Sequence, residues 1–92
     1  MVAVHPGRIL KRELKARALS ANKLSLALRV PSGRLTSILN GKRGITPDTA
    51  LRLSRYFGNN ALFWMNLQTR YDLMIAEDVI GSQIDKEVQH VA

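Results

Sequence analysis

Apolar residues recur three and four positions apart along most of the sequence, and no stretch alternates long enough to form a β-strand. Residues that start or stop helices, such as proline, serine, asparagine and glycine, divide this pattern into five segments. We therefore predict an all-α chain of five helices. Its 92 residues fit one domain, which buries roughly 60–70% of the surface of its unfolded chain.

The first two predicted helices have clear local signals at their ends. Pro6 fits the first turn of a helix, and Ser20 is a good N-cap for the second. The second helix must end before Pro31, because a proline disfavours helical geometry in the residue before it. The residues predicted to face the core are Ile9, Leu10, Leu14, Leu24 and Leu28.

The third and fourth helices are bounded in the same way. The third is predicted from Pro31 or Ser32 to Asn40 and Gly41, where glycine can adopt a left-handed conformation. The fourth opens at Thr46-Pro47-Asp48, in which Asp48 suits the positive end of the helix dipole, and it closes at Gly58. The inward-facing residues are predicted to be Leu35, Ile38, Leu39, Ala50, Leu53 and Phe57.

The fifth predicted helix is capped by Asn60, runs to about Glu77 and carries two apolar faces. The face predicted to meet the core consists of Phe63, Trp64, Leu67, Tyr71, Met74 and Ile75. The opposite face consists of Leu62, Met65 and Leu73. We interpret this second face as a homodimer contact, although part of it can instead pack under the tail. Residues 1–80 are expected to form the domain and residues 81–92 a short acidic tail, either frayed or helical for a turn or two.

Charge is distributed unevenly along the chain. Residues 1–70 contain 13 Lys and Arg residues against Glu13 and Asp48, whereas residues 71–92 contain only Lys86 against five acidic residues. A basic body of this kind suggests a polyanionic partner, although solubility alone also accounts for basic surfaces. There is no cysteine, no apolar run of membrane-spanning length and no signal-peptide pattern. We expect a soluble, cytoplasmic protein in a reducing compartment.

Residues 20–29 and 31–40 have the size and spacing of a helix-turn-helix motif, spanning about residues 20–41. In that motif the second helix enters the DNA major groove. Ser32, Gly33, Thr36 and Ser37 are small enough to let its surface approach base edges. The nearby cations Arg34, Lys42 and Arg43 are suited to phosphates or, for Arg34, to a guanine.

Two blocks that follow this motif indicate which branch of helix-turn-helix proteins the sequence resembles. They are "GITPDTALRLSRYFG" and "FWMNLQTRYDL". Over about residues 5–80 the sequence resembles the HigA-type antitoxins, a branch of the lambda-repressor-like (XRE) helix-turn-helix proteins that includes virulence-associated protein I. The resemblance implies a dimeric repressor of its own operon that binds a palindromic operator and neutralises a HigB-type toxin, an mRNA endonuclease. Its groove-facing positions fall on Ser32, Gly33, Thr36 and Ser37, and its backbone-facing positions on Asn22, Lys23, Arg34, Asn40, Lys42 and Arg43.

Two positions depart from the usual motif. Ala21 stands where phage repressors often have a glutamine that helps to fix a phosphate, so that contact is in doubt. Arg29 stands where the turn usually has glycine. A residue other than glycine tolerates positive φ only at a cost, so the turn is expected to be strained or differently shaped.

Other classes of function have little support. His5 and His90 lie far apart in the sequence without the companions of a metal site, and we find no nucleophile–base pair or glycine-rich phosphate loop. We therefore expect no catalytic residue, metal or cofactor. Two alternatives to the antitoxin remain open. One is a helix-turn-helix regulator without a toxin partner, and the other is an interaction module whose basic face serves only solvation.

Overall fold

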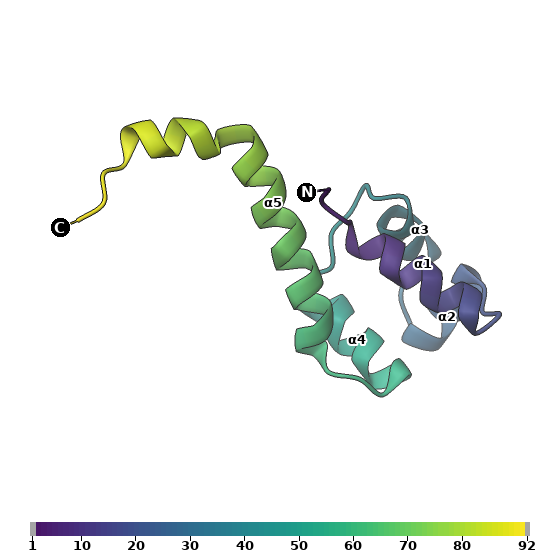
Figure 1. Ribbon diagram of the computed structural model, residues 1–92. Coiled ribbons are helices and arrows are strands. Elements are labelled where there is room, and N and C mark those ends of the chain that lie inside the picture. The colour runs from purple at the N-terminus through teal and green to yellow at the C-terminus, as the bar shows by residue number, and fades with distance from the viewer. Residues whose placement is uncertain (1, 92) are drawn as a thin grey trace.

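The structure is a computed structural model that describes residues 2–91, and it contains five helices and no strand within that range. The helices are α1 (Pro6–Ala16), α2 (Ala21–Leu28), α3 (Ser32–Leu39), α4 (Pro47–Phe57) and α5 (Ala61–Glu87). Figure 1 shows α1 to α4 packed together on one side of the first half of α5, with α1 and α4 next to it, while the rest of α5 extends away. The predicted all-α, five-helix fold is confirmed.

Most helix ends follow the local signals in the sequence. The Ser20 hydroxyl accepts a hydrogen bond from the Lys23 amide at 3.1 Å, and the Asn60 side chain accepts one from the Leu62 amide at 2.7 Å. Gly41 and Gly58 have φ of 74° and 75°, the left-handed conformation expected after α3 and α4. The N-cap of α1, which we did not predict, is His5, whose Nδ1 accepts a hydrogen bond from the Gly7 amide at 2.9 Å.

The core lies where α1 to α4 meet the first turns of α5. Trp64 is fully buried there, and its indole nitrogen donates to the Asn59 side chain at 3.1 Å. Helix α1 approaches α3 so closely that a methyl group on Gly7 would overlap the Ile38 carbonyl oxygen. The buried apolar residues are Leu10, Leu14, Leu24, Leu28, Leu35, Ile38, Ile45, Ala50, Leu53 and Trp64. All the inward-facing residues predicted for the first four helices are in this core or packed against it.

The prediction for α5 was wrong in its length and in part of its inward face. The helix continues ten residues past Glu77 to Glu87. Phe63 is 45% exposed and Ile75 is 40% exposed, although both were predicted to face the core. For Ile75 the reason is that α1 and α4 cover only the first half of α5, so its later apolar residues meet no other helix. Phe63 lies in the first turn of α5, about 100° round the helix from the buried Trp64, and its ring packs edge to face on the Trp64 ring with centroids 5.1 Å apart. The predicted boundary between residues 80 and 81 stays a prediction, although α5 runs across it without a break.

The second apolar face of α5 also needs one correction. Leu62 and Leu73 are 60% and 65% exposed, as a face turned away from the core requires. Met65 is half-buried and packs against the core. Its long, unbranched side chain reaches the core from the edge of the stripe. Met65 therefore exposes only part of its side chain, and its place in the dimer contact stays a prediction.

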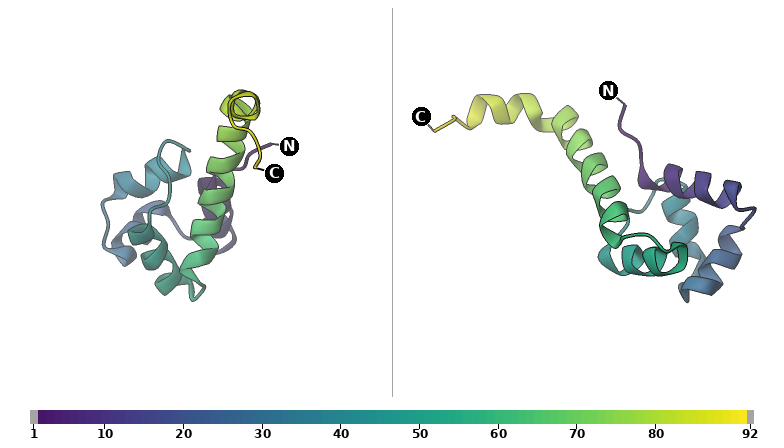
Figure 2. Two further views of the ribbon diagram at one scale, coloured as in Figure 1. Left: turned by 90° about the vertical axis from the view of Figure 1, so that its left-hand side faces the viewer. Right: turned by 60° about the horizontal axis from the view of Figure 1, so that its bottom comes forward.

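The last part of α5 and the residues that follow it form an arm, which we define as residues 75–91. Figures 1 and 2 show that it bends away from the other helices and makes the molecule elongated. The Cα radius of gyration is 15.9 Å, compared with about 12 Å for a compact domain of this length. The pair Gly81–Ser82, a combination at which helices often bend, lies within the arm. None of the helices in residues 2–91 is long and apolar enough to span a membrane.

Candidate nucleic-acid interface

Helices α2 and α3 form a helix-turn-helix with a left-handed turn. Arg29, the residue that follows α2, has φ of 59° and ψ of 44°. The Val30 amide donates to the Ser25 carbonyl at 3.1 Å, which closes the end of α2. The turn therefore has the shape that glycine favours but is made by arginine, at a cost in backbone strain.

The outward face of α3 is lined by small residues. Ser32, Gly33 and Thr36 are exposed, and Ser37 is half-buried. A methyl group added to Gly33 would meet no protein atom within 4 Å. No contact inside the chain therefore requires glycine at this position. The small size of these side chains therefore matters only for a ligand that approaches α3 from outside the chain.

Arg34 lies beside this face, but it is not a free cation. Its Nη1 donates to Oδ1 of Asp48, in the first turn of α4, at 2.9 Å. Arg52 donates to the same oxygen from Nε at 2.9 Å, and its Nη1 donates to the Leu28 carbonyl oxygen at 2.8 Å. The sequence pattern predicts only that Asp48 lies at the start of a helix. The structure adds that its carboxylate links α4 to the second helix of the motif.

The hydrogen bond from Arg52 is the main cause that lowers the pKa of Asp48 from its usual value of 3.8, with a further contribution from Arg34. A carboxyl group whose pKa is lowered in the folded state stabilises that state above its unfolded pKa. This contribution is lost as the pH falls through the lowered pKa. The Asp48 carboxylate is therefore charged, and bonded to both arginines, throughout the neutral range.

Lys42 and Arg43 lie in the loop that follows α3. Both side chains are exposed, and neither forms an ion pair within residues 2–91. Their amides both donate to the Ser37 carbonyl oxygen, at 2.9 and 3.2 Å. The backbone of the loop is thereby fixed to the end of α3, while the two cationic side chains are left available to a ligand.

The other predicted residues lie at the ends of the two helices. Asn22 and Lys23 are exposed in the first turn of α2, and Asn40 is the exposed C-cap of α3. The ten predicted residues thus form three groups, at the start of α2, along α3 and in the loop after it. Figure 2 shows that these segments lie at the end of the molecule opposite to the arm.

Sequence reasoning missed Gln68, which holds this loop in place from α5. Gln68 is buried, and its Oε1 accepts a hydrogen bond from the Ile45 amide at 2.7 Å. Its Nε2 donates to the Asp72 side chain at 2.9 Å. The available signal was its position four residues after Trp64, which places a polar side chain on the core-facing side of α5.

The helix-turn-helix family model matches residues 10–64, which contain α2, α3, the loop after them and the bonds of Asp48. The chain belongs to this family. Virulence-associated protein I of Dichelobacter nodosus is 55% identical over 78 residues, which make up 84% of this chain and 72% of that protein. The resemblance to this branch of helix-turn-helix proteins is confirmed. The family is one of regulators, so the chain is not an enzyme.

Two solved structures match nearly the whole of this helix-turn-helix chain. An addiction module antidote protein of the HigA family from Coxiella burnetii has a TM-score of 0.96 and 48% identity, covering 99% of this chain and 100% of that one. The Pseudomonas aeruginosa antitoxin HigA, solved with the higBA promoter, has a TM-score of 0.96 and 40% identity, with the same coverage. The agreement extends over the arm as well as the motif, because 99% of the chain is covered in both cases.

Proposed function

We propose that this protein is the antitoxin of a type II toxin–antitoxin module, acting in the cytoplasm. In this proposal it binds the palindromic operator of its own operon as a homodimer and neutralises a HigB-type mRNA endonuclease. The observation that carries the DNA-binding part is the small, exposed face of α3 bordered by cations, with open space around Gly33. The similarity to an antitoxin solved with promoter DNA supports the same conclusion.

The proposed division of roles on DNA follows the three groups of residues. Helix α3 enters the major groove, where its small residues approach base edges and Arg34 contacts a guanine. Lys42 and Arg43 neutralise phosphates, because they are exposed and without an acidic partner in residues 2–91. The residues at the helix ends contact the sugar-phosphate backbone. These residues are Asn22, Lys23 and Asn40.

The first experiment is a mobility-shift titration of the protein on the DNA upstream of its own gene, at about 150 mM salt. A duplex of the same composition in scrambled order serves as competitor. We expect retardation that survives this competitor. Retardation that the scrambled duplex abolishes would leave only attraction between charges and would refute operator binding.

The phosphate contacts are tested by the salt dependence of binding. Lys42→Ala and Arg43→Ala should each weaken binding to all sequences and lower the slope of log K against log salt by about 1. Lys86→Ala is the matched control, since it removes the same charge from the arm. Equal slopes for Lys42→Ala and wild type would show that Lys42 does not contact phosphate.

The proposed homodimer contact uses the exposed apolar side chains of α5 outside the core. Leu62 and Leu73 belong to it, and the arm adds others that no helix within residues 2–91 covers. These additional residues are Val79, Ile80, Ile84 and Val88. Two helix-turn-helix motifs in a dimer bind half-sites about one helical turn, roughly 34–36 Å, apart or a multiple of that.

Leu73→Asp tests the dimer by light scattering coupled to gel filtration. We expect a shift from dimer to monomer, since the substitution places a charge in an apolar contact. Ser82→Asp is the control, because it adds the same charge on the same helix about 180° round from Leu73. Equal masses for Leu73→Asp and wild type would remove Leu73 from the interface.

The toxin-binding part of the proposal assigns the acidic side chains of α5 from Asp72 to Glu87 to a basic toxin. These residues are Asp72, Glu77, Asp78, Asp85 and Glu87. A chain lacking residues 81–92 keeps every residue of the core. We expect this chain to lose capture of a toxin encoded beside its gene. Unchanged capture would refute the assignment of Asp85 and Glu87, the two acidic residues that the truncation removes. Absence of any toxin gene would favour a regulator without a toxin.

A further inference from the structure

A chain of hydrogen bonds connects both helices of the motif to α4 through one carboxylate oxygen. Oδ1 of Asp48 accepts from Arg34 on α3 and from Arg52 on α4, each at 2.9 Å. Arg52 in turn donates to the carbonyl oxygen of Leu28, the last residue of α2. Each member of this network is therefore fixed by another element of the fold.

This network restricts the side chain of Arg34, the cation on α3 that is proposed to contact a base. A solvated arginine samples many rotamers and loses that freedom when it binds. Arg34 is already held, with its side chain only 29% exposed. The bond to Asp48 involves one nitrogen, Nη1, so the remaining donors of the planar guanidinium group stay available for a guanine edge.

Asp48 is an unusual residue for a surface that meets DNA. Only two of the acidic residues lie in residues 1–70, and the other, Glu13 on α1, pairs with Arg17, the C-cap of that helix, at 3.1 Å. A carboxylate beside the motif repels phosphates and so weakens binding to any duplex. The helix dipole favours an acidic residue in the first turn of α4 but does not account for bonds to two arginines.

We propose that Asp48 is a positioning residue for sequence recognition. It holds the Arg34 guanidinium in the orientation that contacts a base, and it raises the preference for the operator while lowering the affinity for DNA in general. The inference rests on the proposed function, since it requires α3 to enter the major groove. Arg52 donates to the same oxygen of Asp48 and ties the network to α2.

Asp48→Asn tests this role, because asparagine keeps the size of the side chain and removes its charge. The quantity to measure is the ratio of the Kd for scrambled DNA to the Kd for the operator. Asp48→Asn should bind scrambled DNA more tightly and lower this ratio several-fold. Arg34→Ala should lower it more, by about 5- to 150-fold, the range for loss of a bidentate base contact. Glu13→Gln, the matched control, should leave the ratio unchanged.

The double variant Asp48→Asn with Arg34→Ala decides whether the two residues act together. We expect its ratio to equal that of Arg34→Ala alone, because Asp48 then has no base-contacting arginine to position. A ratio that falls by the same factor in both backgrounds would show that Asp48 acts without Arg34 and would overturn the proposal. An unchanged or raised ratio for Asp48→Asn alone would also overturn it.

Asp48→Glu keeps the test valid if Asp48→Asn does not fold, as judged by thermal melting. Glutamate keeps the negative charge at the start of α4 but displaces the carboxylate by one methylene group. The ratio should still fall, whereas an unchanged ratio would mean that only the helix-start charge matters and would overturn the proposal. Failure of the proposed function gives a different result, since wild type and Arg34→Ala would then both have ratios near unity.

Discussion

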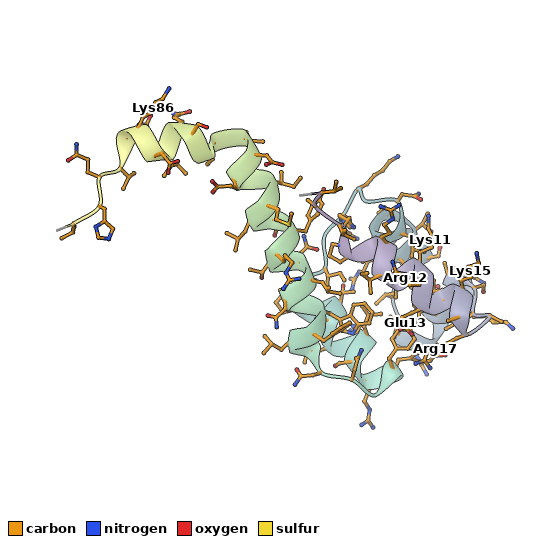
Figure 3. All side chains as sticks on the ribbon, in the orientation of Figure 1. Lys11, Arg12, Glu13, Lys15, Arg17 and Lys86 are labelled. Carbon is orange, nitrogen blue, oxygen red and sulfur yellow. The ribbon has the colours of Figure 1, made fainter. Side chains whose placement is uncertain are left out.

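The body (residues 2–74) and the arm (residues 75–91) belong to one continuous helical chain but differ in packing and charge. Every buried apolar side chain lies in the body, whereas the arm exposes Val79, Ile80, Ile84 and Val88. The body contains 13 of the 14 basic residues, as Figure 3 illustrates for the side chains along α1, and Lys86 is the one basic residue of the arm. The body is therefore stabilised by its own packing, whereas the apolar side chains of the arm are not covered by any other helix within residues 2–91.

The largest effect expected is a contrast between two positions of α5. Trp64→Ala should lower the free energy of unfolding by about 3–5 kcal/mol, because it leaves a cavity in the core. Val79→Ala, on the same helix in the exposed arm, should change it by less than about 0.5 kcal/mol. Urea unfolding of dilute, monomeric protein followed by circular dichroism measures both. Similar losses would mean that the arm packs on the body in solution.

Substitutions of two helical glycines test the same contrast, because their effects on stability are expected to have opposite signs. Gly7→Ala should destabilise the body by about 1–3 kcal/mol, because the added methyl group overlaps a backbone oxygen of α3 that cannot move freely. Gly81→Ala should instead stabilise the arm by up to about 1 kcal/mol through helix propensity. Its methyl group meets the Glu77 carboxylate, at 2.6 Å, and the end of that flexible side chain can rotate away.

These two substitutions are compared by thermal melting for the body and by helical ellipticity for the arm. Higher ellipticity for Gly81→Ala with an unchanged melting temperature is the expected combination. A loss of stability as large as that for Gly7→Ala would show that Gly81 lies against a packed surface, contrary to the separation of arm and body.

A pair of glutamines tests whether similar hydrogen bonds differ in strength between the two regions. Gln68→Ala should cost about 1–3 kcal/mol, because it leaves the Ile45 amide buried without an acceptor. Gln83 also bonds to a carboxylate four residues on, Glu87, at 2.8 Å, but both side chains are exposed. Gln83→Ala should therefore cost less than about 0.5 kcal/mol. Urea unfolding measures both losses of stability. Equal losses for Gln68→Ala and Gln83→Ala would contradict a solvent-exposed arm.

Sequence reasoning succeeded in the body because the determinants there are local. Caps such as Ser20 and Asn60, and inward stripes such as Leu24 and Leu28, act within a few residues. It failed for Phe63 and Ile75 because periodicity gives the face of a helix but not which neighbour covers it. The bonds of Asp48 to Arg34 and of Gln68 to Ile45 span 14 and 23 positions, so no local pattern predicts them.

Relief of backbone strain is expected to change the free energy of unfolding least. Within residues 2–91, the strained residues also lie in the body. Ala18 and Arg29 are the residues other than glycine with positive φ, and both precede residue 75. Arg29→Gly should relieve about 1–2 kcal/mol of left-handed strain. Part of this gain is offset by the greater freedom of glycine in the unfolded chain, leaving a net increase of roughly 0.5 kcal/mol.

Ala18→Gly is the matched comparison for Arg29→Gly, because it relieves the same strain without changing charge. Both variants should raise the midpoint of urea unfolding slightly, and only Arg29→Gly should also weaken DNA binding, through the lost charge. A lower midpoint for Arg29→Gly alone would show that the arginine side chain stabilises the turn through its own contacts. The usual glycine of this motif would then be unsuited to this chain, and the departure at Arg29 would be a structural requirement.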